Sequence, residues 1–108
     1  MALQDQRPKI KKSDAYIIDV SGEFRVRPSA AVVRKPDEFE ICNLTQATFV
    51  VKLLAAGVPE FSLEPGDWIS VPLTEASGAF EYEVMLASDR TRKARGESDP
   101  VIIIDPSA

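Results

Sequence analysis

Alternating apolar and polar residues between Phe61 and Leu86 constrain the fold of this chain more than any other feature. Near the end of this stretch, alternate positions form two sets of side chains: Phe80, Tyr82, Val84 and Leu86 in one, and Glu81, Glu83 and Met85 in the other. A period of two is typical of a strand that buries one face. The same period appears earlier in a shorter apolar set: Ile69, Val71 and Leu73. The residues Pro65-Gly66 just before this set predict a turn, because proline presets φ at its second position and glycine accepts the positive φ of its third. We therefore expect two strands here, each with one buried face.

Further short strands are expected on both sides of this stretch. The other runs of β-forming residues are Asp14–Val20, Glu23–Arg27, Ala30–Arg34, Glu38–Asn43, Ala47–Leu54 and Val101–Ile104. Turn signals such as Ser21-Gly22 separate them at intervals of about 8–12 residues. One short helical turn is expected over Asp89–Arg95, within a long charged connection, because Ser88 is able to cap it and Gly96 to end it. These features predict an all-β fold: a single antiparallel Greek-key β-sandwich of about seven to eight strands, with at most one short helical turn.

The length of 108 residues predicts one domain. We place this domain at residues 13–106 and expect a flexible N-terminal arm at residues 1–12, which are polar and rich in both charges. No apolar run approaches the ~20 residues of a membrane span, and the N-terminus has no apolar core of a secretory signal. A lone cysteine, Cys42, fits a reducing compartment. Together these features predict a cytoplasmic protein without a membrane partner.

The sequence contains no histidine, which is the commonest metal ligand and the commonest general base. Cys42 therefore lacks a histidine to activate it as a nucleophile, and Glu40 beside it disfavours the thiolate. Glu81 and Glu83 are spaced as the polar face of a strand, although two carboxylates are also able to do acid–base chemistry. We predict that the protein is not an enzyme and that it has no catalytic, cofactor-binding or metal-binding residues.

Several short pieces occur in an order that is known from one family. The turn Arg34-Lys35-Pro36-Asp37 leads to a strand that ends in asparagine, Phe39–Asn43. Pro65-Gly66 is followed by the strand Trp68–Leu73, and a later strand carries Gly78, Phe80, Tyr82 and Val84 at alternate positions. In this order and spacing, residues 30–86 resemble the cupredoxin family, and Val101–Ile104 resembles its closing strand. The resemblance implies a cupredoxin-like β-sandwich.

The resemblance also implies a copper site, and the sequence departs from the family at that site. Cupredoxin copper is held by two histidines and a cysteine, with a weak methionine ligand. The first histidine is expected near Ala47 or Thr48, and Val84 stands where the ligand cysteine is expected. Cys42 precedes Asn43 and does not map to the ligand position. We therefore expect the cupredoxin scaffold without its copper site.

Two surface features are candidates for binding a partner. Trp68 alternates with the inward residues of its strand, so we expect it to be half-exposed, either as a binding anchor or as a cover over the open end of the sandwich. The second feature is a run of cations in the connection between Ala87 and Pro100: Arg90, Arg92, Lys93 and Arg95. These cations are able to dock phosphate or an acidic partner, or they form a solvated face balanced by nearby acidic residues.

These observations predict a non-catalytic protein-interaction or assembly module on a cupredoxin-like scaffold. Its partner is expected to be another protein or a second copy, with a homodimer through an edge strand as one form. The net charge of −4 disfavours nucleic acid as a partner. The alternative is a metal-binding or redox protein related to cupredoxins, which rests on the family resemblance alone.

Overall fold

The computed structural model describes residues 13–33, 38–54, 60–73, 78–96 and 99–104, and these residues form ten strands and no helix. Accordingly, no helix in these ranges is long and apolar enough to cross a membrane. The strands are β1 (Ala15–Val20), β2 (Glu23–Arg27), β3 (Ala30–Val32), β4 (Glu38–Asn43), β5 (Phe49–Leu53), β6 (Phe61–Leu63), β7 (Trp68–Pro72), β8 (Gly78–Leu86), β9 (Asp89–Ala94) and β10 (Val101–Ile104).

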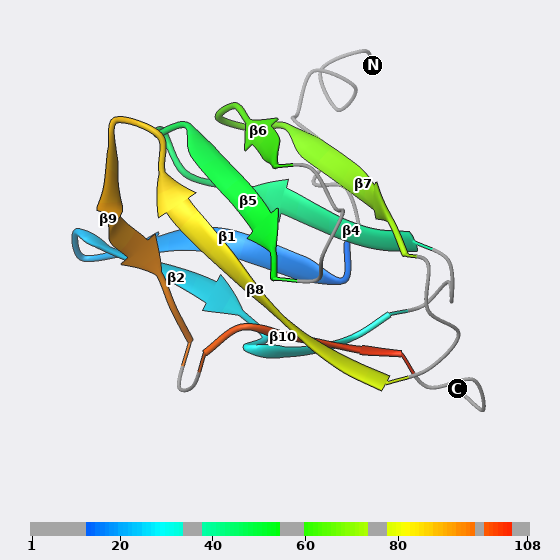
Figure 1. Ribbon diagram of the computed structural model, residues 1–108. Helices are drawn as coiled ribbons and strands as arrows, with labels where there is room; N and C mark the ends of the chain where they lie inside the picture. Colours follow the sequence, from blue (N-terminus) through cyan, green and yellow to red (C-terminus); the bar gives the residue numbers. More distant parts are fainter. Residues whose placement is uncertain (1–12, 34–37, 55–59, 74–77, 97–98, 105–108) are drawn as a thin grey trace, which may run out of the picture.

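The strands form two sheets that pack face to face (Figure 1). The smaller sheet has the order β2-β1-β4-β7. The larger sheet has the order β3-β10-β8-β5-β6, and β9 also pairs with β8. The predicted β-sandwich is therefore confirmed. The expected arm at residues 1–12 lies outside the described residues, as do residues 105–106 at the end of the predicted domain.

Three details of the predicted fold were wrong. The sandwich has ten strands rather than seven or eight, and it is not purely antiparallel, because β1 pairs with β4 and β3 with β10 in parallel. Between β2 and β4, both in the smaller sheet, the chain crosses to the larger sheet to form β3. The expected helical turn over Asp89–Arg95 is strand β9, which pairs antiparallel with the end of β8. Since β10 pairs only with the first residues of β8, β9 provides the hydrogen-bonding partner for the rest of that edge.

Alternating side chains of both sheets fill the space between them, as the sequence predicted. Tyr82 and Val84 on β8 are fully buried, and the Tyr82 ring lies 5.0 Å from the Phe39 ring. Glu40 and Cys42 alternate with the core residues Phe39 and Ile41, yet only 5% and 2% of their surfaces are exposed. They lie on the face of β4 opposite to Phe39 and Ile41, and β4 is an inner strand of its sheet, between β1 and β7.

A buried asparagine joins three parts of the chain at one end of the sandwich. The Asn43 Nδ2 group donates to the carbonyl oxygens of Ala47, Leu63 and Glu64, at 2.7, 3.2 and 3.2 Å. Its Oδ1 atom accepts hydrogen bonds from the backbone amide and the hydroxyl of Thr45, at 3.0 and 2.8 Å. Asn43 thereby holds the loop after β4 and the turn after β6 in place.

Candidate functional site

The predicted cations lie on one edge strand and are exposed. Arg90, Arg92 and Lys93 belong to β9, and Arg95 follows it. Arg90 donates from Nη1 to Glu60 Oε2 at 2.9 Å, and Lys93 forms an ion pair with Glu83 on β8. Two of the four candidate cations are thus paired within the molecule.

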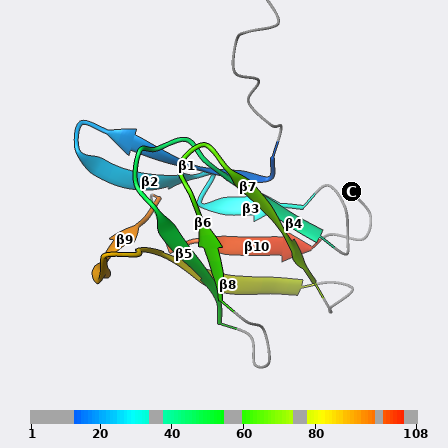
Figure 2. The same cartoon turned by 90° about the horizontal axis from the view of Figure 1, so that it is seen from above.

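The end of β9 lies beside β2, so the two sheets meet along this side of the sandwich (Figures 1 and 2). The backbone amide of Val26 donates to the Arg95 carbonyl oxygen at 3.0 Å, and the Arg95 amide donates to the Phe24 carbonyl oxygen at 3.4 Å. A groove of about 430 Å³ runs along this junction; its principal lining residues are Glu23, Phe24, Arg25, Arg92, Lys93 and Arg95. We call it the basic groove.

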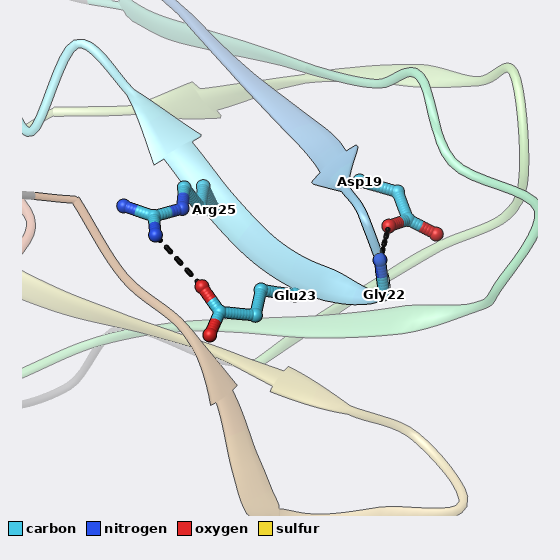
Figure 3. A network of polar contacts seen from close by, with 4 residues as sticks. All are labelled: Asp19, Gly22, Glu23 and Arg25. Carbon is cyan, nitrogen blue, oxygen red and sulfur yellow. Dashed lines mark hydrogen bonds and ion pairs between the residues drawn. The ribbon is translucent and has the colours of Figure 1, made fainter.

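A tight turn sets the position of the β2 side of the basic groove. Ser21 and Gly22 both have positive φ values, 54° and 88°, as the two central residues of a type I′ hairpin turn require. The Asp19 carboxylate accepts a hydrogen bond from the Gly22 amide at 2.8 Å and fixes this turn (Figure 3). The predicted turn at Ser21-Gly22 is thereby confirmed, and it places Glu23 and Arg25 at the start of β2.

Aromatic packing holds one arginine of the basic groove. The Arg92 guanidinium lies 5.3 Å from the centre of the Phe24 ring, within the range of a cation–π interaction. Phe24 in turn packs edge-to-face against Phe49, with ring centres 5.0 Å apart. Arg92 is thus supported by a ring that belongs to the packed interior, and its planar fork of N–H donors is restrained at the rim.

The carboxylate at the start of β9 is held mainly by hydrogen bonds within its own turn. The Thr91 hydroxyl donates to Asp89 Oδ1 at 2.6 Å, and the Thr91 amide donates to the same atom at 3.1 Å. These hydrogen bonds, with a smaller contribution from the charge of Arg92, lower the pKa of Asp89 below its usual value. Asp89 therefore remains ionised and closes the β8–β9 turn.

Sequence reasoning missed two cations near this junction, Arg25 and Arg27 on β2. Arg25 lines the basic groove, where its Nη2 group donates to Glu23 Oε2 at 2.7 Å (Figure 3). Arg27 and Arg25 both line a second hollow of about 230 Å³ that continues past Pro28. The only sequence signal for them was the outward position of both arginines on the expected strand Glu23–Arg27.

Trp68 is not part of the basic groove. It lies on β7, at the opposite edge of the smaller sheet from β2, and 43% of its surface is exposed. This exposure agrees with the expectation from its strand pattern. The structure therefore separates the candidate partner-binding residues into two surfaces, one around Trp68 and one around the basic groove. Arg90 does not line the basic groove.

Cys42 lies next to Trp68, because the two residues are partners in the β4–β7 register. Burial, and to a smaller extent the negative charge of Asp67, raise the pKa of the Cys42 thiol. The thiol is therefore protonated near neutral pH, and protonated thiols are poor nucleophiles and poor metal ligands.

The residues present do not fit the copper site that the fold implies. A cupredoxin site needs histidine ligands, and the sequence has none. Cys42 lies in the smaller sheet and Met85 in the larger one, and both lie outside the apolar core between the sheets. Val84 is fully buried within that core. Within the described ranges, no three His, Cys, Asp or Glu side chains are grouped so that they could hold a metal ion. That the scaffold lacks copper stays a prediction.

Comparison with known proteins supports the fold. No family model and no curated protein matches the chain. A solved structure, described as a novel purple cupredoxin from Nitrosopumilus maritimus, is similar to it with a TM-score of 0.51. The match covers 85% of this chain and 100% of that chain, at 15% sequence identity. At this identity the likeness concerns the fold, and the chain has a cupredoxin-like fold.

Proposed function

We propose that the protein is a non-catalytic protein-interaction module that associates with a second copy through the edge of its smaller sheet. The observation that carries this proposal is the exposed Trp68 on β7, an edge strand. An edge strand has unpaired backbone groups on one side, and these groups are able to pair with a strand of another chain. A tryptophan at such an edge supplies apolar area of the kind that anchors protein interfaces.

The chemistry of the chain supports a non-catalytic role. The thiol of Cys42 is buried and has a raised pKa, and the sequence has no histidine to act as a base. Glu83, one of the two strand carboxylates considered for acid–base work, is paired with Lys93. An isologous dimer through β7 would bring Trp68 of both copies into the same interface, one toward each end of the paired strands.

Size-exclusion chromatography with light scattering tests this proposal. We expect the wild-type protein to show about twice the chain mass of 11.9 kDa at tens of micromolar. Trp68→Lys places a charge at the edge and should return the protein to the monomer mass. Leu54→Lys is the matched control, since Leu54 is also an exposed apolar residue, 49% exposed, on the other sheet. A wild-type monomer at these concentrations, or a dimer that persists in Trp68→Lys, would refute self-association through this edge.

The second candidate function is metal binding or electron transfer. The observation in its favour is the similarity in fold to a protein described as a purple cupredoxin. Titration with Cu(II) and Cu(I), followed by elemental analysis, tests it, with Cys42→Ser as the control for thiolate ligation. We expect no stoichiometric binding. One tightly bound copper per chain that is lost in Cys42→Ser would favour this candidate over a purely interacting module.

A further inference from the structure

The basic groove carries an excess of positive charge in a chain that is negative as a whole. Its cations, together with Arg27 in the adjoining hollow, number five: Arg25, Arg27, Arg92, Lys93 and Arg95. Glu23 and Glu83 each neutralise one of them through an ion pair, so three positive charges remain. The chain as a whole has a net charge of −4. The charge distribution is therefore strongly asymmetric, and this junction attracts anions.

Three of these arginines have no carboxylate partner within the part of the chain that the structure describes. Among the described residues, Arg27, Arg92 and Arg95 form no ion pair. Their guanidinium groups therefore keep most of their donors available, and a planar guanidinium binds a carboxylate through two parallel hydrogen bonds.

The backbone brings two of the cations together. Arg25 and Arg95 are partners in a parallel bridge between β2 and the end of β9, held by the two backbone hydrogen bonds described above. Like charges at directly paired positions destabilise a sheet. In addition, the Arg25 Nε atom is buried and has no hydrogen-bond partner among the described residues. A bound anion would offset the repulsion between Arg25 and Arg95 and would accept a hydrogen bond from the Arg25 Nε group. The positions of these two arginines therefore suit a complex with an anion better than they suit the isolated chain.

We infer that the basic groove binds an extended acidic segment of a partner protein. Arg25 and Arg27 are two residues apart on one strand, which separates their Cα atoms by about 6.6 Å. Alternate side chains of an extended peptide have the same spacing, so carboxylates at alternate positions match this row of cations. Arg92 and Arg95, on the β9 side, are placed to contact the same segment from the other side of the groove.

The arrangement favours a peptide over two other anions. A single phosphate ion requires donors that converge on one point, whereas these cations are spread along two strands and two adjoining hollows. Single-stranded nucleic acid is bound largely by stacking on exposed aromatic rings. The aromatic residue that lines the groove, Phe24, is covered by Arg92 and packed against Phe49. The negative charge of the rest of the chain also repels a long polyanion.

Fluorescence anisotropy with a labelled peptide carrying glutamate at alternate positions tests the inference on the full chain. We expect saturable binding at about 50 mM salt that weakens as salt screens the charges. The same peptide with glutamine in place of glutamate should not bind. Arg25→Gln combined with Arg95→Gln should weaken binding by about tenfold or more, because each bond to a carboxylate is charge-assisted. Arg90→Gln is the matched control, since Arg90 is on the same strand but outside the groove, and it should change affinity less than about twofold.

Two further measurements separate binding from folding. Thermal unfolding of the free Arg95→Gln variant should show a midpoint at or above that of the wild type, because a repelling charge is removed; the peptide should raise the wild-type midpoint more than that of the variant. Arg27→Gln should also weaken peptide binding. Because Arg27 is exposed and forms no ion pair among the described residues, this variant tests the inference even if the double variant does not fold. The inference is independent of self-association through β7, so Trp68→Lys should bind the peptide as the wild type does.

Several outcomes would overturn the inference. These are absence of peptide binding at low salt, equal affinity of the wild type and the double variant, tighter binding of a single-stranded oligonucleotide than of the peptide, and displacement of the peptide by inorganic phosphate at similar concentrations.

Discussion

Replacement of Asn43 by alanine should strongly destabilise the protein. The Asn43 side chain is fully buried and takes part in five hydrogen bonds, three to carbonyl oxygens and two from Thr45. Removing it leaves two or three buried polar groups without a partner, and each such group costs about 1–3 kcal/mol. We therefore expect a loss of about 3–5 kcal/mol from a free energy of unfolding of about 5–15 kcal/mol. This loss corresponds to a fall in Tm of more than about 10 °C.

Urea denaturation, followed by circular dichroism and by the fluorescence of Trp68, measures this loss. Gln46→Ala is the control: Gln46 is an exposed polar residue of the same loop, and its replacement should change stability by less than about 0.5 kcal/mol.

Asn43→Asp would place a carboxylate against three carbonyl oxygens, which raises the pKa of that carboxylate in the folded protein. Its destabilisation relative to wild type should therefore be smaller at pH 4 than at pH 7. A loss below about 1 kcal/mol for Asn43→Ala would refute this account of the hydrogen bonds.

Three other predictions concern single groups. The Tyr82 hydroxyl is buried without a hydrogen-bond partner and burial raises its pKa, so Tyr82→Phe should leave the urea midpoint unchanged or raise it; a loss above about 1 kcal/mol would contradict this. The Cys42 thiol should react with a disulfide reagent at pH 8 far more slowly in the folded protein than in urea, since it is buried and its pKa is raised; equal rates would show that it is accessible. Thr91→Ala removes a hydrogen bond that lowers the pKa of Asp89, so an NMR titration should show a higher pKa. In the wild type, the stabilisation from this lowered pKa is present above the unfolded value and is lost on acidification.

Much of the fold was predictable because burial alternates along the strands. The turn at Pro65-Gly66 is present, with a φ of 77° at Gly66 and a hydrogen bond from the Asp67 amide to the Glu64 carbonyl oxygen at 3.1 Å. Strand β9 was not predictable in the same way. Of its residues only Ala94 is buried, so it lacks the apolar alternation that marks a strand. It is a strand because β8 extends beyond β10 and its backbone needs a partner, a requirement that local sequence does not express.

The candidate site was predicted only in part, for a related reason. The density of charge in the sequence identified Arg92, Lys93 and Arg95, all of which line the basic groove. It also included Arg90, which instead pairs with Glu60, thirty residues away in the sequence. Arg25 was missed because its contribution depends on which strands meet at the junction of the two sheets. Alternation reports which face a residue occupies, but it does not report which other strand lies beside it.

The position of Asn43 links the departure from the cupredoxin pattern to the stability of this end of the sandwich. The resemblance places a copper ligand near Ala47 or Thr48, but here the Ala47 carbonyl oxygen accepts from Asn43 and the Thr48 hydroxyl donates to Glu64 at 3.1 Å. The loop is therefore held by amide, hydroxyl and carboxylate groups of the protein itself. At the β2–β9 junction the situation differs, because Arg25 and Arg95 are paired positions and the buried Arg25 Nε atom has no hydrogen-bond partner among the described residues. An anionic partner bound at this junction would therefore reduce the repulsion between paired cations, which no internal group in the described ranges does for Arg95.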